Sequence, residues 1–237
     1  MTLSGLAAGF AAGSPTTAAE GLAATASPAS AAASPATTAW LHPNADGPPP
    51  GHTGGFGEPT CAACHDEFPL NPPGGELRVE GLEWPVPPGA SRIVTVLLRS
   101  PDMENTGFEA AFRVADGEDA GAPVGRVTPL DDRTAVTRAE ADGVEYVHHT
   151  RVGSAIEEEA APVRVARWSF RWTAPARSAS VVLHVAANSG NADDSPLGDL
   201  IFTTSLAFPV RRGRSAVGVR PVSPPRTPSR APRPSGG

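Results

Sequence analysis

The chain lacks several features that define common protein classes. Lysine is absent, and cysteine occurs only twice in the 237 residues. Both cysteines lie in one short motif, so none remains to form a disulfide elsewhere. No stretch approaches the roughly 18 consecutive apolar residues of a membrane-spanning helix. We also find no G-x-S-x-G motif, phosphate-binding loop or Ser-His-Asp spacing. These absences disfavour a disulfide scaffold, a membrane helix and the common enzyme classes, so we expect a protein that is not an enzyme.

Charge is divided unevenly along the chain. Residues 1–210 carry all 25 acids and 12 arginines, a net charge of −13, whereas residues 211–237 carry seven arginines and no acid. An acidic body is a poor candidate for binding nucleic acid. The basic tail has a composition that can touch acidic surfaces or lipid head groups, although such tails are more often simply solvated.

Composition also divides the chain into four parts. Residues 1–50 are rich in Ala, Ser and Pro, and we predict a disordered leader there. Its first residues lack the basic start of a signal peptide, so a truncated signal is the alternative. Residues 51–75 are rich in turn formers, residues 76–210 have the texture of a folded domain, and residues 211–237 are predicted to be a disordered tail of Arg, Pro and Ser.

The folded part reads as β-structure throughout. Short β-rich runs alternate with turn signals, and no convincing helix appears. Trp168, Phe170 and Trp172 share one face at a period of two, which predicts that they are buried together. The fold class is therefore all-β, an antiparallel immunoglobulin-like β-sandwich. We predict its strands near residues 76–82, 92–99, 107–115, 123–128, 133–138, 143–150, 164–172, 180–187 and 199–210.

The most informative motif is Cys61-Ala62-Ala63-Cys64-His65. A C-x-x-C-H motif attaches haem c covalently, because its two thiols can each form a thioether with one vinyl group of the haem. The histidine that follows is then placed as an axial ligand of the iron. We therefore predict haem c on Cys61 and Cys64, with His65 as the proximal iron ligand.

Two other readings of the motif remain open. A redox dithiol usually opens a helix, but the residues after His65 include Pro69, Pro72 and Pro73, which break helices. Zinc held by Cys61, Cys64, His65 and a distant ligand is the second alternative, although adjacent Cys and His do not match the separated pairs of zinc fingers.

Little chain is available to enclose a haem. Only about ten residues separate His65 from the first predicted strand, which leaves no room for a helical haem domain. A bound haem must therefore lie against the sandwich or stay largely exposed. Exposure favours the ferric state and lowers the reduction potential.

Several phrases carry a family resemblance over residues 51–210. They are the stretch 51–60 directly before the motif, Tyr146–Thr150, Trp172–Pro175, and Asn188–Asn191 running on to Gly198-Asp199. Together they resemble bacterial choice-of-anchor V domain proteins, which pair one C-x-x-C-H motif with a sandwich similar to the reeler domain. The resemblance implies a reeler-like β-sandwich carrying a haem. Such proteins often end in a membrane or sorting anchor, whereas this chain ends in its Arg/Pro/Ser tail.

The sixth iron ligand is open among several side chains. His148 and His149 are adjacent on a predicted strand and must point to opposite faces. From the resemblance we take His149 as the candidate distal ligand and expect His148 to face solvent. The phrase His149-Thr150 also resembles a structural one in reeler domains that carry no haem. His52 and Met103 are further candidates, and His184 reads as a packed sandwich histidine.

Together these observations predict an extracytoplasmic mono-haem c-type protein that transfers or senses electrons. Haem c is attached outside the cytoplasm, so we expect the protein at the cell surface, in the periplasm or secreted, with an extracytoplasmic redox partner. The alternative is a non-catalytic surface, adhesion or metal-binding module. Acids crowd two loops, and we read them as solvated rather than as calcium sites: Asp131, Asp132, Asp193, Asp194 and Asp199.

Overall fold

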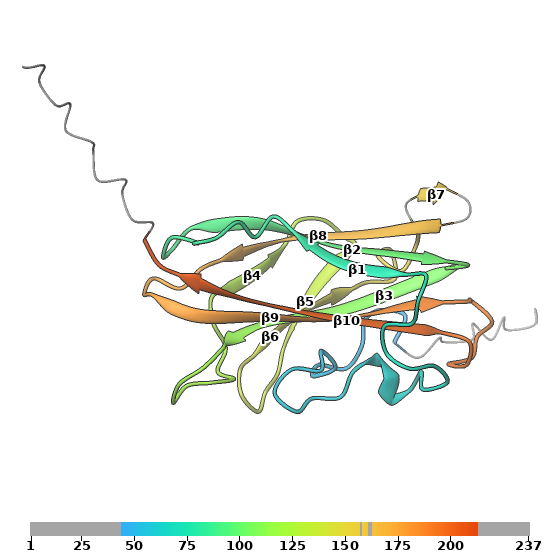
Figure 1. The fold of residues 1–237 in the computed structure, drawn as a ribbon, viewed down its shortest axis with the longest axis horizontal. Coiled ribbons are helices and arrows are strands. Elements are labelled where there is room, and N and C mark those ends of the chain that lie inside the picture. Colours follow the sequence, from blue (N-terminus) through green and yellow to red (C-terminus); the bar gives the residue numbers. More distant parts are fainter. Residues whose placement is uncertain (1–43, 157, 161–162, 213–237) are drawn as a thin grey trace, which may run out of the picture. The chain divides into compact units, whose positions relative to one another are not determined.

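A computed structural model describes residues 44–156, 158–160 and 163–212. In this part of the chain two five-stranded antiparallel sheets face each other, and the only helix is a single 3₁₀ turn (Figure 1). The predicted all-β sandwich is confirmed. Most of the predicted leader and nearly all of the predicted tail lie outside the described residues.

The first sheet has the order β1-β2-β8-β4, with β7 also paired to β8. The second sheet has the order β10-β9-β3-β6-β5 (Figure 1). The strands of the first sheet are β1 (Glu76–Glu80), β2 (Ser91–Pro101), β4 (Arg126–Pro129), β7 (Glu158–Ala160) and β8 (Val163–Thr173). Those of the second are β3 (Asn105–Val114), β5 (Thr134–Arg138), β6 (Glu145–His149), β9 (Ala179–Gly190) and β10 (Leu200–Val210).

Nine of these strands match the predicted runs, and β7 was not predicted. Three residues beginning with two glutamates are too short and too acidic to give a β signal in the sequence. Strand β4 also starts later than predicted, at Arg126. The reason is that Gly125 has a φ of 78°, which is incompatible with extended backbone.

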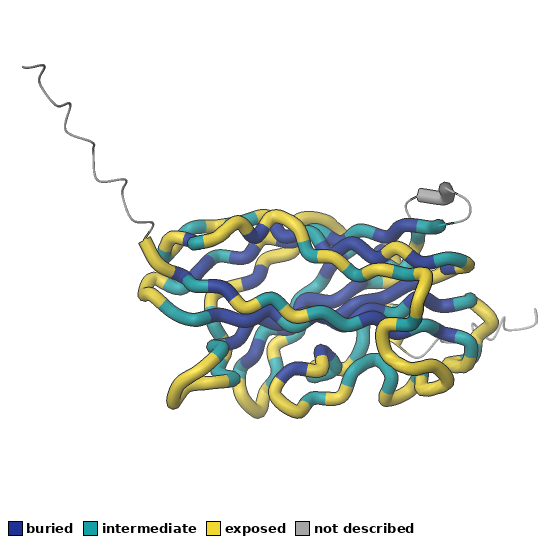
Figure 2. The backbone as a smooth tube through the Cα atoms, viewed as in Figure 1, coloured by how far each residue is buried: buried dark blue, intermediate teal, exposed yellow. Residues whose placement is uncertain are grey.

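The aromatic stripe on β8 forms the centre of the core. Trp168, Phe170 and Trp172 are fully buried between the sheets, as predicted. Figure 2 shows buried residues gathered along the strands and exposed ones in the loops that join them. On the facing strand β3, Phe108 stacks on Trp168 with ring centroids 4.6 Å apart, and Phe112 stacks on Trp172 at 4.5 Å. Aromatic contacts of this kind add to the free energy gained by burying large apolar surfaces.

Residues 44–75 lie across the outer face of the second sheet (Figure 1). Glycine makes this close approach possible. A Cβ on Gly47 would come within 2.1 Å of the His148 ring, and one on Gly55 within 2.5 Å of the His184 ring. Described structure thus begins at residue 44, inside the predicted leader of residues 1–50. The outer face of this sheet is therefore covered by the segment that carries the C-x-x-C-H motif.

Candidate haem-attachment site

The motif forms a short 3₁₀ turn, η1 (Cys61–Ala63). Thr60 caps it, because its side-chain oxygen accepts a hydrogen bond from the Ala62 N–H at 3.2 Å. The N–H groups of Cys64 and His65 both bond the Cys61 carbonyl at 3.2 Å, which folds the two cysteines and the histidine around one turn. Cys64 is exposed, Cys61 is half-buried, and both thiols are free.

His65 is turned towards a buried carboxylate. Its Nδ1 lies 2.7 Å from Oδ2 of Asp199, which is only 5% exposed. The contact is close but not aligned as a hydrogen bond, and Nδ1 has no better-placed partner among the described residues. Asp199 is itself held in place, since it accepts hydrogen bonds from Asn188 Nδ2 at 3.0 Å and from the Asn191 N–H at 3.1 Å. With Nδ1 facing Asp199, the other ring nitrogen, Nε2, is left to bind a metal.

After the motif, hydrogen bonds hold the chain against the loop before β10 and against β10 itself. Oε2 of Glu67 accepts a hydrogen bond from the Gly198 N–H at 2.5 Å, and the Asn71 N–H donates to the Ile201 carbonyl at 2.8 Å. Three large apolar side chains of these two stretches are nevertheless exposed: Phe68 at 41%, Leu70 at 43% and Leu197 at 55%. An apolar ring system attached at the motif would find hydrophobic neighbours there.

The loop before the motif is fixed by a buried ion pair. Glu58 Oε1 accepts hydrogen bonds from Nη2 of Arg113 on β3 and from the hydroxyl of Tyr146 on β6. The other carboxylate oxygen accepts from Thr53 Oγ1 at 2.5 Å, and the Phe56 ring lies 5.6 Å from the guanidinium. The stretch 51–60, which carries part of the family resemblance, is thus the part that docks the motif onto the sheet.

A second carboxylate, Glu109 on β3, is completely buried beneath this loop. Its Oε2 accepts a hydrogen bond from the His52 N–H at 2.5 Å, while its Oε1 has no partner among the described residues. Burial raises the pKa of Glu109 to about 8, although the N–H groups of His52 and Gly51 oppose the shift. Glu109 is therefore mostly protonated at neutral pH.

The Cys61 thiol lies in the same environment. Burial, with the nearby Glu109 charge as the second cause, raises its pKa to about 12. A thiol with so high a pKa is a poor redox nucleophile at neutral pH, which disfavours the redox dithiol. A bound zinc ion would itself deprotonate the thiols, so this pKa does not bear on the zinc reading of the motif.

Protonation of Glu109 predicts an unusual dependence of stability on pH. Between about pH 4.5 and 8 the folded state binds a proton that the unfolded state has lost, so the free energy of unfolding falls as pH rises through this range. Glu109→Gln keeps an oxygen acceptor and should remove this slope. We expect the variant to melt higher than the wild type at pH 8 and nearly equally at pH 4.5. Glu118→Gln, at an exposed turn, is the control, and equal slopes in all three proteins would contradict this assignment.

His149, the candidate distal ligand, has both ring nitrogens occupied by backbone groups. Nδ1 accepts from the Phe108 N–H at 3.1 Å, and Nε2 lies 3.3 Å from the Asn44 carbonyl. The ring fills the space that a Cβ on Gly107 would need, and burial lowers its pKa. This arrangement supports the structural role that His149-Thr150 suggested in sequence.

The expectation that His148 faces solvent is wrong. Its ring is only 6% exposed, because residues 44–50 cover this face of the sheet, and Nε2 lies 2.9 Å from Thr137 Oγ1. Strand alternation does send His148 and His149 to opposite faces, but here both faces are covered.

The remaining ligand candidates are also accounted for. Met103 lies in the turn between β2 and β3, as predicted, but its side chain is fully buried in the core, so it is not available as a ligand. His52 Nδ1 lies 2.9 Å from the Pro49 carbonyl. His184 packs edge-on against Phe56 on the outer sheet face, and not in the sandwich core.

Across the described residues, no group of three or more His, Cys, Asp or Glu side chains is arranged to hold a metal ion. Instead, aspartates of the acidic loops accept hydrogen bonds from nearby backbone groups. Asp193 Oδ1 accepts one from the Ser195 N–H at 2.9 Å. Asp131 does the same with the Arg133 N–H at 3.0 Å. These contacts agree with reading the two aspartates as turn acids.

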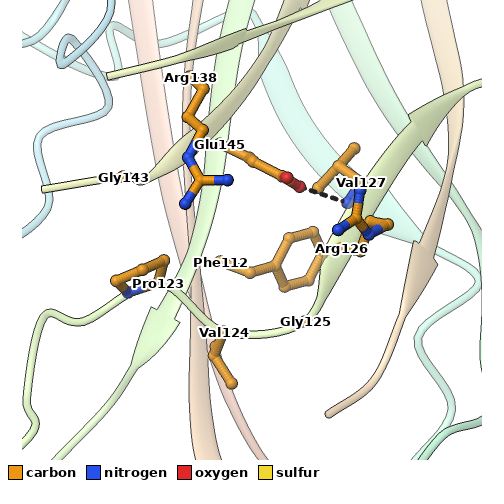
Figure 3. Close-up of a pocket in the computed structure, with 9 residues that line it drawn as sticks. All are labelled: Phe112, Pro123, Val124, Gly125, Arg126, Val127, Arg138, Gly143 and Glu145. Atoms are coloured by element: carbon orange, nitrogen blue, oxygen red, sulfur yellow. Dashed lines mark hydrogen bonds between the residues drawn. The ribbon is translucent and has the colours of Figure 1, made fainter. Parts of the chain in front are cut away.

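A shallow pocket lies elsewhere, between β4 and the β5–β6 hairpin (Figure 3). Its floor is Phe112, and its one carboxylate, Glu145, accepts a hydrogen bond from the Val127 N–H at 2.9 Å. That bond ties the second sheet to the first. The pocket therefore has no second carboxylate to form a catalytic acid–base pair.

Sequence reasoning found the motif but missed its two carboxylate partners. Asp199 was grouped with loop acids, although it follows Gly198 in a phrase that carries the resemblance. Glu109 stands in the run Gly107–Phe112 as the only charged residue. A lone charge within a buried strand was the signal available for it.

Comparisons with known proteins bear on the fold. No protein-family model matches the chain, and no curated protein matches it. Among solved structures, the human F-spondin reeler domain is 19% identical, covers 59% of this chain and 92% of its own, and has a TM-score of 0.35. A cohesin module of a Clostridium perfringens family 33 glycoside hydrolase is 18% identical, with coverages of 58% and 96% and a TM-score of 0.37. At these identities and TM-scores the similarity extends no further than the β-sandwich fold.

Proposed function

We propose that this chain is an extracytoplasmic mono-haem c-type protein that transfers or senses electrons. Cys61 and Cys64 would hold the haem covalently, and His65 would be the proximal iron ligand. The observation that carries the proposal is the His65–Asp199 contact, which directs Nδ1 inward and leaves Nε2 for a metal.

The residues around the motif fit a haem. Haem c would supply a one-electron ferric–ferrous couple at this position. Cys64 is accessible for attachment, and the turn of η1 keeps His65 beside both cysteines. Phe68, Leu70 and Leu197 offer apolar surface on the two stretches next to the motif. The surroundings remain open to solvent, which suits exchange of electrons with another protein.

Location and partner follow from the chemistry of attachment. Haem c is joined to its protein outside the cytoplasm, so we place the chain at the cell surface, in the periplasm or among secreted proteins. Its redox partner would be extracytoplasmic. In the described part of the chain no helix has the length and apolarity to cross a membrane.

A non-catalytic surface module is the second candidate. The observation that favours it is that no residue of the motif contributes to the hydrophobic core, which is built from strands and the residues beside them. The sandwich is therefore equipped to fold and present a surface without any cofactor.

Mass spectrometry and the visible spectrum separate the two candidates. The full chain, exported in a host with a haem c maturation system, should gain the mass of one haem that survives denaturation, with the sharp α-band of a reduced c-type haem. Cys61→Ala/Cys64→Ala should carry no haem while keeping the β-type circular dichroism of the wild type. A wild-type protein of unmodified mass with two free thiols would overturn the proposal and favour the surface module.

A further inference from the structure

Asp199 places a negative charge beside His65, which a neutral acceptor would not do. It is a carboxylate, 5% exposed, at 2.7 Å from Nδ1. The groups that donate hydrogen bonds to it are neutral, the Asn188 amide and the Asn191 N–H. Among the described residues no arginine pairs with it, so its negative charge is directed at His65.

A buried carboxylate beside a ligating histidine has two separable effects. As an oxygen 2.7 Å from Nδ1 it favours the neutral tautomer with the proton on Nδ1, because an unprotonated Nδ1 would face the lone pairs of the carboxylate. Its negative charge, in a medium of low dielectric, increases the electron donation from Nε2. It therefore favours the oxidised, more positive state of a metal ion bound to Nε2. A backbone carbonyl in the same place would supply the first effect and little of the second.

We propose that Asp199 is a positioning residue that locks His65 with its proton on Nδ1 and, through its charge, holds the site at a low reduction potential. This inference rests on the proposed function, and it adds a residue and a direction to it. The partners expected for such a site are low-potential electron donors and acceptors. Asp199 also joins the motif to the loop before β10, so the position of the ligand depends on the sandwich itself.

The tautomer of His65 tests the first half without any haem. In the haem-free wild-type protein, nitrogen-15 NMR of the neutral His65 ring should show its proton on Nδ1. Asp199→Asn retains an oxygen acceptor and should keep that tautomer. Asp199→Ala should revert to the Nε2–H form that free histidine favours. An Nε2–H tautomer in the wild type would overturn the inference whatever the haem content.

The reduction potential tests the second half in haem-loaded protein. Removing the charge with Asp199→Asn should shift the equilibrium constant for reduction about tenfold towards the ferrous state, which corresponds to a rise of about 59 mV for one electron. Asp193→Asn is the matched control, since it removes a carboxylate from the same loop. The Asp193 carboxylate accepts hydrogen bonds from the Asn191 side chain and the Ser195 N–H. Its potential should stay close to that of the wild type.

The outcomes distinguish this inference from the proposed function. If haem attaches but Asp199→Asn and the wild type share one potential, the inference fails and the function stands. If Asp193→Asn shifts the potential as much as Asp199→Asn, the effect is one of general surface charge and the inference also fails. If no haem attaches in the wild type, the function fails, while the tautomer still reports whether Asp199 positions His65.

Discussion

Trp172→Ala should lower the stability of the sandwich by about 3–5 kcal/mol, the usual cost of truncating a buried tryptophan. The side chain is fully buried, stacks on Phe112 at 4.5 Å and meets the Phe208 ring edge-on at 5.6 Å. Its indole N–H also donates to the Val124 carbonyl at 3.3 Å, in the segment that leads into β4. A loss of this size is a large share of the roughly 5–15 kcal/mol available to a domain. Urea titration followed by circular dichroism measures it.

Trp84 provides a matched control for this experiment. It also stacks on Phe208, with ring centroids 6.4 Å apart, but it is 57% exposed. Trp84→Ala should therefore cost about 1 kcal/mol or less. Similar unfolding midpoints for the two variants would mean that the stripe on β8 does not form the core.

Arg113→Leu should release the loop that docks the motif. The substitution leaves the buried Glu58 carboxylate with only neutral partners, and breaking a buried pair in this way costs about 3–5 kcal/mol. Because the loop can lift and hydrate Glu58, we expect local opening before global unfolding. Hydrogen exchange should show lost protection at Gly54, whose N–H bonds the Pro59 carbonyl at 2.9 Å.

Two further variants make the result specific to the buried pair. Arg151→Leu breaks the exposed contact with Asp46, at 3.1 Å, and should cost no more than about 1 kcal/mol. Adding Glu58→Gln to Arg113→Leu removes the unpaired charge and should restore part of the lost protection. Unchanged exchange at Gly54 in Arg113→Leu would show that the loop is held by other contacts.

The sequence by itself determined the class of the fold. A period of two in residues 167–172 places three aromatic rings on one face and Arg167, Ser169 and Arg171 on the other. Since no helix was predicted that could cover the aromatic face, a second sheet was expected to bury it. Turn residues between the β-rich runs then marked where each predicted strand begins and ends. Strand β7 was not predicted, because its three residues have no apolar pattern that indicates a strand.

The sequence also determined the motif, since the reactivity of Cys61, Cys64 and His65 depends on residue type and local spacing. Other assignments failed where burial depends on distant chain. His148 was expected to face solvent because nothing local shows that residues 44–50 cover its strand. Met103 was a candidate ligand because a polar sequence around it hides its place in the core.

Only the tertiary structure decided what surrounds the motif. Asp199 is 134 residues away from His65 in sequence, and the two meet because β10 starts beside the segment that follows the motif. Glu109 and Arg113 lie on the outer face of β3, where sequence patterning predicts solvent, and they are buried because residues 51–60 fold over them. Periodicity reports which side of a strand a residue occupies, whereas what covers that side is set by contacts between remote parts of the chain.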